Sequence, residues 1–293
     1  MLKYRIAGLI MEISAPDWAL HENLCFFAIE NGQTDVFCQV VFKKRPDEPA
    51  EGAIIIAKTP GTRIYEYHNQ MYNVSGDEKD IPSFVITAKD FHSCTMFVDP
   101  EYMDSQNSDT VQIVRNGIFA SLRDVVIGAL AQRNGLIIHS STIIWQGKGV
   151  MFSAPSGTGK STHTHLWQQL CQTPVLDGDA AACRIVDGVP VVYGLPWCGT
   201  SGEFINTSVP LEVVVFLQQS QNNSLTKLDL QEAILRLAAR CFLLPWNEEL
   251  MNQYFDTVQE IAESVDCYLL NCLPDPEAVE LVKNCLEMKG TGI

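Results

Sequence analysis

Ten residues near the middle of the chain have the types and spacing of a phosphate-binding loop. They follow the apolar run 149–152 and read Ser153-Ala154-Pro155-Ser156-Gly157-Thr158-Gly159-Lys160-Ser161-Thr162. Phosphate oxygens need many N–H donors at close range, and the two glycines let the backbone curl around them. Lys160 adds a positive charge at the β- and γ-phosphates, and Ser161 adds a hydroxyl ligand for Mg²⁺. The stretch therefore predicts that ATP and Mg²⁺ bind at residues 154–162.

The loop departs from the strict pattern at one position, where Ala154 replaces a glycine. The difference is one methyl group. The alternative interpretation is a chance turn, rich in glycine and serine, before a surface lysine. Apolar residues before the loop and helix-compatible residues after it favour phosphate binding.

Two aspartates follow the helix that the loop is expected to begin. Residues 174–176 are typical of a short strand, which runs into Asp177-Gly178-Asp179. In an extended chain, side chains two residues apart project from the same side, so both carboxylates can face one point. Two carboxylates beside a phosphate-binding loop suit metal-assisted phosphoryl transfer. The alternative is an ordinary acidic turn.

Three further features carry weaker signals. Arg236 and Arg240 lie one helical turn apart and can present a guanidinium to phosphate, although a solvated helix face is the more common explanation. Residues 194–206 are rich in glycine and hydroxyl groups, which suits either a segment that closes over a substrate or a plain connection. His163 and His165 face different directions on a helix, which argues against a shared metal.

These residues need a scaffold, and the hydrophobic pattern predicts one in two parts. Short aromatic and β-branched runs up to about residue 100 predict a mostly β region. Spacings of three and four between Val111 and Leu130 predict an amphipathic helix that joins the parts. We predict a domain over 1–105 for substrate recognition or contact between subunits of a homo-oligomer, and a catalytic P-loop domain over 106–293.

The expected elements follow from the same pattern. Strands of the first part are expected at 6–13, 36–42, 52–57, 62–67 and 83–86. Strands of the second part are expected at 136–138, 142–145, 150–152, 174–176, 182–186, 189–193, 213–217 and 267–271. Helices are expected at 161–172, 229–242, 248–264 and 275–288, the last with Asp275 as its N-cap.

Composition limits the classes of function. The 293 residues include 20 Lys and Arg against 35 Asp and Glu, a net charge of −15, which argues against a large nucleic-acid interface. Ten cysteines without a C-x-x-C pair do not indicate a zinc ribbon and suit a reducing compartment. No apolar run approaches a membrane span, and the first residues do not resemble a signal peptide. These patterns predict a cytoplasmic protein without a membrane partner.

Residues 135–286 resemble the kinase domain of HPr kinase/phosphorylase and the wider group of HPr-kinase-like, phosphoenolpyruvate-carboxykinase-related P-loop proteins. The resemblance rests on His139 within Leu136-Ile137-Ile138-His139-Ser140-Ser141, on the loop 154–161 and on Asp177-Gly178-Asp179. The segment Pro196-Trp197-Cys198-Gly199-Thr200 resembles HPr-kinase-like proteins found beside peptide-modification genes, some of which phosphorylate a serine of a precursor peptide.

The resemblance implies an α/β fold in which a mixed sheet is flanked by helices, with ATP held by the backbone of 156–159 and by Lys160. It implies Mg²⁺ on Ser161 and Asp177, and Asp179 as the general base that accepts a proton from a serine-type hydroxyl. His139 would stabilise charge near the phosphates or orient an aspartate, unless it is simply packed at a strand end. In that family the acidic residues are usually adjacent, whereas Gly178 separates them here, so the base and the metal ligand can be exchanged.

The resulting prediction is an ATP-dependent kinase that acts on a serine of a protein or peptide. One alternative is a kinase of a small hydroxylated metabolite such as free serine. The other is a regulatory protein that binds a nucleotide without transferring phosphate. The sequence has no convincing form of the second glycine-rich signature of true HPr kinases, which argues against HPr as the acceptor and against the reverse phosphorylase reaction.

Overall fold

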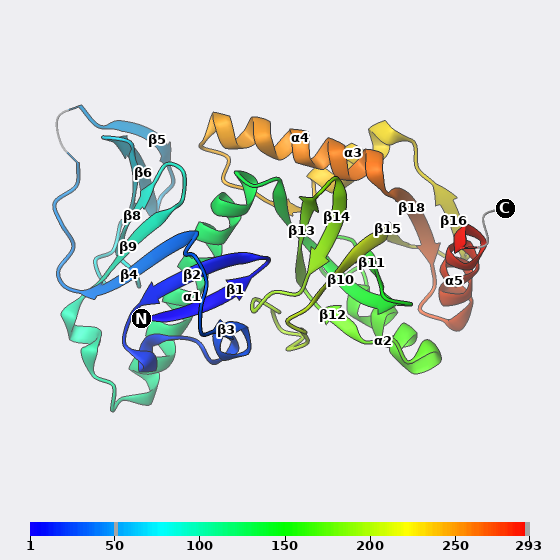
Figure 1. Cartoon of the computed structure of the whole chain (residues 1–293), viewed down its shortest axis with the longest axis horizontal. Coiled ribbons are helices and arrows are strands. Elements are labelled where there is room, and N and C mark those ends of the chain that lie inside the picture. The colour runs from blue at the N-terminus through cyan, green and yellow to red at the C-terminus, as the bar shows by residue number, and fades with distance from the viewer. Residues whose placement is uncertain (50–51, 291–293) are drawn as a thin grey trace. The chain divides into compact units, whose positions relative to one another are not determined.

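The computed structural model describes residues 1–49 and 52–290. Two compact units are present: Met1–Arg133 with Leu244–Met251, and Asn134–Leu243 with the residues from Asn252 onward (Figure 1). The sequence pattern had placed the division after residue 105. Helix α1 (Ser108–Ala131) belongs to the first unit because its glycines allow close packing there, with Gly117 against the backbone of Ile81 and Gly128 against the ring of Phe91.

The first unit is mostly β, as predicted. Its described residues form a nine-stranded sheet. In spatial order the strands are β3 (Ala28–Ile29), β1 (Leu2–Ile6), β2 (Leu9–Ser14), β4 (Val36–Phe42), β9 (Ser93–Val98), β8 (Phe84–Ala88), β7 (Gln70–Ser75), β6 (Thr62–Tyr67) and β5 (Ile54–Lys58). Short 3-10 helices cover Asp17–Ala19, Glu22–Phe27 and Pro100–Met103.

The run 6–13 is not the single strand that the sequence predicted. Ala7 and Gly8 have φ angles of +49° and +79°, so they form a tight turn between β1 and β2. Two consecutive residues with positive φ give the turn geometry that matches the twist of paired strands. An alanine at the first of these positions gives a weak sequence signal, because turns of this type favour asparagine, aspartate or glycine.

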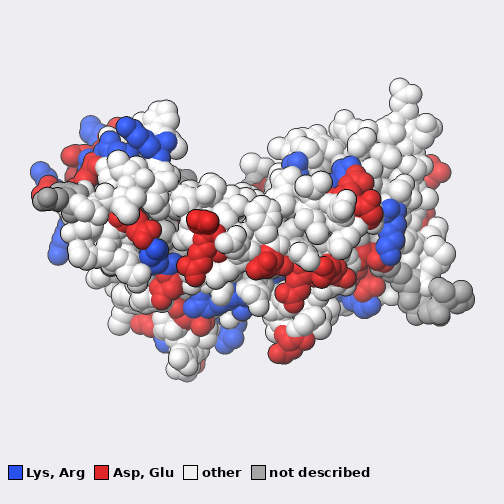
Figure 2. All heavy atoms as spheres, turned by 90° about the horizontal axis from the view of Figure 1, so that it is seen from above, with Lys and Arg blue, Asp and Glu red and all other residues white. Residues whose placement is uncertain are grey.

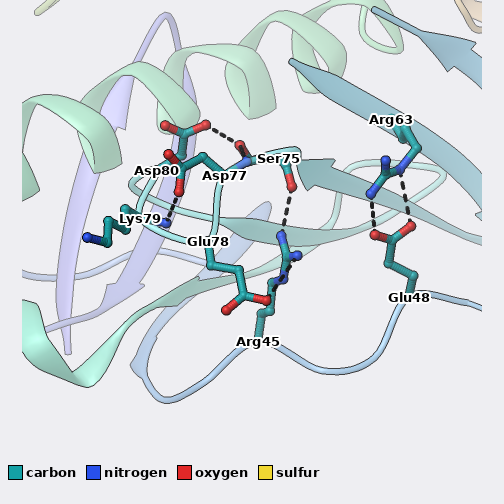
Figure 3. Close-up of polar contacts among 8 residues, drawn as sticks. All are labelled: Arg45, Glu48, Arg63, Ser75, Asp77, Glu78, Lys79 and Asp80. Carbon is teal, nitrogen blue, oxygen red and sulfur yellow. Dashed lines mark hydrogen bonds and ion pairs between the residues drawn. The ribbon is translucent and has the colours of Figure 1, made fainter. Parts of the chain in front are cut away.

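Polar contacts hold the segment between β4 and β5 in place (Figure 3). Glu48 accepts a hydrogen bond from Nε of Arg63 at 3.1 Å, and Arg63 also pairs with it through a second nitrogen. Arg45 donates to the backbone oxygen of Ser75 at 2.7 Å and lies 3.4 Å from a Glu78 oxygen. Ion pairs this accessible to solvent contribute little free energy, so their role is to fix the path of the segment.

The second unit contains a mixed sheet, which confirms the predicted fold class. In spatial order its strands are β11 (Lys148–Ser153), β10 (Gly135–Trp145), β13 (Ala180–Val186), β14 (Val189–Tyr193), β15 (Ser208–Gln219), β18 (Asp266–Cys272) and β16 (Ser224–Lys227). Two short strands, β12 (Val175–Asp177) and β17 (Cys241–Phe242), pair with β10. Because β15 also pairs in parallel with β11, the strands from β11 to β15 close a ring.

Strand β10 replaces the two strands predicted at 136–138 and 142–145. It runs without interruption and changes partner along its length, from β13 at residues 135–139 to β12 at residues 142–143. This change brings the end of β12 beside the start of β13. Asp177 and Asp179 lie at that junction.

Helices cover both faces of this sheet. On one face, α2 (Lys160–Cys171) and α5 (Pro276–Gly290) pack against a core that includes Phe152, Trp167 and Val279. The other face carries α3 (Leu230–Ala238) and α4 (Glu248–Ser264) (Figure 1). Helix α3 is shorter than the predicted 229–242 because residues 241–242 join β10 as β17. Asp275 caps α5 as predicted, accepting from the amide of Ala278 at 3.2 Å.

Helix α4 is strongly acidic, and acidic side chains gather on the surface seen in Figure 2. It contains no Lys or Arg, and its acidic residues are Glu248, Glu249, Asp256, Glu260 and Glu263. Among the helices within residues 1–49 and 52–290, none has the length and hydrophobicity needed to cross a membrane.

Candidate phosphate-transfer site

The predicted phosphate-binding loop lies between β11 and α2, and its surface is open. Gly157 and Gly159 have φ angles of +77° and +113°, which glycine adopts at low cost. Apart from chain neighbours, no described atom lies within 4 Å of where a Cβ would stand at either glycine. Backbone N–H groups around an open turn at the N-terminus of a 12-residue helix form an anion site, so the loop fits a phosphate group.

Ala154 explains the departure from the strict loop pattern. It is 2% exposed and packs in the same core as Phe152 and Trp167. Its methyl group therefore points into the protein, away from the exposed residues 155–157. The substitution leaves the open side of the loop unchanged.

Lys160 begins α2 and its ammonium group lies within the loop. The Nζ atom donates to the backbone oxygen of Ala154 and contacts Nε2 of His139, each at 3.1 Å. The residue is 7% exposed, and burial lowers the pKa of its ammonium group, as does the nearby charge of Arg240. The charge of Asp179 acts in the opposite direction. Lys160 is thus a partly desolvated cation, which interacts strongly with an anion.

His139 and Asp179 complete a cluster with Lys160. Because an ammonium group can only donate, Nε2 of His139 must accept, which requires a neutral imidazole. Burial and the charge of Lys160 lower the pKa of His139, in agreement with that state. An Oδ1 atom of Asp179 lies 3.8 Å from the same Nε2, and the Asp179 side chain remains 41% exposed. The structure therefore brings together three of the predicted catalytic residues, with one carboxylate open to solvent.

Arg240 is a candidate that the sequence pattern undervalued. Its backbone oxygen accepts from the amide of His139 at 2.8 Å, and its charge lowers the pKa of both His139 and Lys160. Within the part of the chain that the structure describes, no carboxylate forms an ion pair with it. Arg236, in contrast, donates to Glu232 at 2.7 and 2.9 Å. Of these two arginines, Arg240 alone combines a guanidinium without a carboxylate partner among the described residues with a position beside the loop.

Asp177 lies in a different environment from Asp179. It is 0% exposed, and its carboxylate accepts from the amides of Asp179 at 3.1 Å, Ala180 at 3.0 Å and Leu195 at 2.9 Å. Burial raises the pKa of Asp177 to about 8, although the three amides oppose the rise because they bind the ionised form. The expectation that both carboxylates face one point rested on an extended chain, and the chain turns here instead.

The loop 194–206 packs over the acidic turn. The amide of Gly178 donates to the backbone of Glu203 at 3.0 Å, and a Cβ at position 178 would collide with the side chain of Ser201. A Cβ at Gly199 would likewise collide with the carboxylate of Asp179. The glycine that separates the two aspartates therefore has a steric cause, because an adjacent acidic pair would not fit beneath this loop.

The same loop is attached to α2. Side-chain oxygens of Glu203 lie 3.1 Å from Nε2 of Gln168 and 3.2 Å from Nε2 of His165. His163 is buried on another face of the helix, where it accepts from Trp167 Nε1 at 3.2 Å, and burial lowers its pKa to about 4. The two histidines face different directions, as their spacing predicted.

Two cavities adjoin the phosphate-binding loop. The first has a volume of about 710 Å³ and is lined by residues 153–158, by Phe216 and by Arg236 and Arg240 of the α3 region. The second, of about 400 Å³, is lined by residues 157–159, by Thr162 at the start of α2 and by residues 272–274. Phe216 lines only the first cavity. Leu217 and Gln219 line both cavities, so the two cavities adjoin each other along β15.

The donors at the site suit a cation held mainly by phosphate. The described residues contain no group of three or more His, Cys, Asp or Glu side chains able to hold a metal. Mg²⁺ is commonly bound by one or two protein oxygens together with substrate phosphates. The exposed hydroxyl of Ser161 and the exposed carboxylate of Asp179 are oxygen donors of that kind.

Comparisons with known proteins give one family. The family described as "SynChlorMet cassette protein ScmC" matches residues 102–275, which is more than half of the chain. A search of the curated proteins finds none that matches. Among solved structures, the chain is similar to the Hpr(Ser) kinase/phosphatase from Coxiella burnetii, with 13% identity over 52% of this chain and 98% of that chain and a TM-score of 0.32.

The family match covers α1 and most of the second unit, including the phosphate-binding loop and the acidic turn. This chain belongs to the SynChlorMet cassette protein ScmC family.

Proposed function

We propose that this chain is an ATP-dependent kinase that transfers the γ-phosphate to a serine-type hydroxyl of a protein or peptide, with Asp179 as the general base. One observation carries the proposal. At the open phosphate-binding loop, Nζ of Lys160 lies 3.1 Å from His139 Nε2, and the exposed carboxylate of Asp179 lies 3.8 Å from the same nitrogen. A cation for phosphate and a carboxylate for the acceptor proton are the groups that phosphoryl transfer requires.

Each residue of the cluster has a separate role in this proposal. The backbone of 156–159 and the ammonium of Lys160 hold the phosphates, and the hydroxyl of Ser161 is a ligand for Mg²⁺. The metal supplies charge neutralisation at the terminal phosphates. Neutral His139 accepts from Lys160 and so keeps the ammonium directed into the loop. Asp179 takes the proton of the acceptor hydroxyl.

Arg240 binds the terminal phosphate in the same scheme. Its guanidinium forms no ion pair with a described carboxylate, and it lines the 710 Å³ cavity at the start of the loop. A guanidinium matches the geometry of phosphate oxygens and keeps its charge at any physiological pH. The residue therefore supplies a second positive charge opposite Lys160.

We assign the nucleoside to the 400 Å³ cavity. That cavity adjoins the later part of the loop and the start of α2, and Leu217, Leu273 and Pro274 give it an apolar wall. An apolar wall suits a base and a sugar, whereas the larger cavity contains two guanidinium groups. Leu273→Asp is expected to raise the KM for ATP about tenfold while leaving kcat unchanged, since tenfold corresponds to about 1.4 kcal/mol.

The sequence predicted Asp177 as a ligand for Mg²⁺. In our proposal Asp177 instead positions Asp179. Its carboxylate is buried and already binds three amides, including that of Asp179. These bonds fix the turn from which the Asp179 side chain projects. Ser161 remains as the protein oxygen donor for Mg²⁺, together with the phosphates of the nucleotide.

The direct test is transfer of label from γ-labelled ATP. With Mg²⁺ and a panel of serine-containing peptides, the wild-type chain should label a peptide, and Asp179→Asn should not, although it still binds ATP by calorimetry. Asp187→Asn is a matched control, because Asp187 is exposed in the turn between β13 and β14. Equal rates of transfer by Asp179→Asn and the wild type would exclude Asp179 as the base. ATP binding without transfer to any acceptor would indicate a regulatory nucleotide-binding protein instead.

A small-molecule acceptor is the second candidate, and the larger cavity favours it. Its volume of about 710 Å³ lies within the range of roughly 300–1,000 Å³ in which small ligands bind. A panel of hydroxylated metabolites that includes free serine, assayed beside the peptides, separates the two classes of acceptor. Labelling of a metabolite alone would exclude the peptide acceptor.

A further inference from the structure

The first unit contains a concave site of its own. Its volume is about 50 Å³, several times the roughly 10–15 Å³ that one water molecule requires. Its walls combine apolar side chains, among them Met71, Phe91 and Trp246, with neutral polar ones such as Asn73 and Thr87. Asp124 of α1 provides the charge in this lining.

The carboxylate of Asp124 has no bonding partner among residues 1–49 and 52–290. Neither a hydrogen bond nor an ion pair reaches it from that part of the chain. Solvent can reach the side chain, yet enough protein surrounds it for burial to raise the pKa of its carboxyl, while the charge of Arg123 opposes the rise. Because the side chain is exposed, its unpaired carboxylate can pair with a cation that arrives from solution.

The aromatic wall beside Asp124 is held rigidly. Phe91 is 3% exposed and has a φ of +55°, which is unusual for a bulky residue. Its ring lies where a Cβ of Gly128 would stand, and Gly128 is a poor helix former in the middle of α1. Asp124 and Gly128 are four residues apart and share one helix face, so these unfavourable local features place the ring next to the carboxylate.

We propose that this site binds a primary alkylammonium group, the side chain of a lysine in a partner protein or peptide. The carboxylate matches its charge, the rings of Phe91 and Trp246 attract a cation, and the apolar wall suits the methylene stem. A compact ammonium fits 50 Å³ better than a planar guanidinium does. The net charge of −15 also favours a basic partner. The inference does not depend on the proposed kinase activity.

The test uses Trp246 as a reporter in the full chain. The chain has five tryptophans, so 5-fluorotryptophan labelling gives separate ¹⁹F signals, and Trp246→Phe identifies the relevant one. Titration with n-butylammonium chloride should shift that signal until saturation, and n-butanol at the same concentrations should not. Asp124→Asn should weaken the response at least tenfold. Glu30→Gln, which removes an exposed carboxylate elsewhere in the unit, should leave it unchanged.

Two results would overturn the proposal. An equal shift with n-butanol would make the site a plain apolar cavity. A response of unchanged strength in Asp124→Asn would show that the carboxylate does not bind the ammonium. If Asp124→Asn does not fold, the comparison of n-butylammonium with n-butanol on the wild-type chain is sufficient to test whether the site binds an ammonium group.

Discussion

The open surface at the phosphate-binding loop and the enclosed layer beneath it use the same residue types in opposite ways. On the surface, Asp179 is 41% exposed. Two residues earlier, Asp177 is fully buried and its carboxylate binds three amides. His165 and His163 repeat the contrast on α2, one exposed and one buried. Residue type therefore says little about role here, and the number of bonds already made by each polar group says much more.

Substitution of Lys160 should give the largest loss of phosphate transfer without a loss of stability. Burial lowers the pKa of its ammonium, so the folded protein holds this charge at a cost. Lys160→Met should lower phosphate transfer by about 10³-fold, as expected when a main electrostatic group is lost. The urea midpoint should stay the same or rise. Lys148→Met, which removes an exposed lysine from β11, should change neither quantity, and a marked loss of stability in Lys160→Met would contradict the assignment.

Substitution of Arg240 should give the second-largest loss of activity. Arg240→Ala is expected to lower kcat/KM about 10²-fold, because its guanidinium is free to bind phosphate. Arg236→Ala is the matched control, since Arg236 is already paired with Glu232, and it should change the rate less than about threefold. Steady-state kinetics on both variants measures the difference. Similar losses in the two variants would place the phosphate site elsewhere in the cavity.

Asp177 belongs to the enclosed layer and should act on stability first. Asp177→Ala leaves three amides without an acceptor, so the free energy of unfolding should fall by about 2–3 kcal/mol. Asp179→Ala should change it by less than about 0.5 kcal/mol, because that side chain is exposed. Urea unfolding of the two variants tests the contrast between the regions. An equal loss of unfolding free energy in the two variants would contradict the contrast between the exposed and the buried aspartate.

His163 gives the smallest expected effect, and it depends on pH. Burial lowers its folded-state pKa to about 4, whereas an unfolded histidine titrates near 6.5. As pH falls through this window the unfolded chain gains a proton and the folded chain does not, so stability decreases. Between pH 7 and pH 5 the loss should be about 2 kcal/mol. His163→Gln should remove this component of the pH dependence, and His165→Gln should keep it.

Local sequence features predicted the parts of the site that depend on neighbours along the chain. The order of strand, loop and helix at 150–172 is confirmed, as are the strands predicted at 182–186 and 189–193 and the cap of α5 at Asp275. In each case a few adjacent residues set the backbone angles or supply the capping oxygen. The same reasoning did not resolve β10, whose change of partner from β13 to β12 depends on strands farther along the chain.

The environments of the two aspartates were beyond prediction from the sequence. Leu195 and Ser201 decide them, and these residues come from a loop 15 or more positions away. The arginines 236 and 240 were equivalent by spacing, and they differ because α3 ends between them and Arg240 lies beside His139. Asp124 gave no signal at all, since an acidic residue in an amphipathic helix is expected on any solvated face.

What the sequence determined by itself was a phosphate-binding turn, because glycines at 157 and 159 can adopt positive φ angles and Lys160 follows them directly. It also determined a mixed α/β unit and a mostly β unit through the periods of their apolar residues. Only the tertiary structure decided which carboxylate stays open and which arginine is free. Burial and hydrogen bonding are set by segments distant in the sequence, and they control the charge and reactivity of each group.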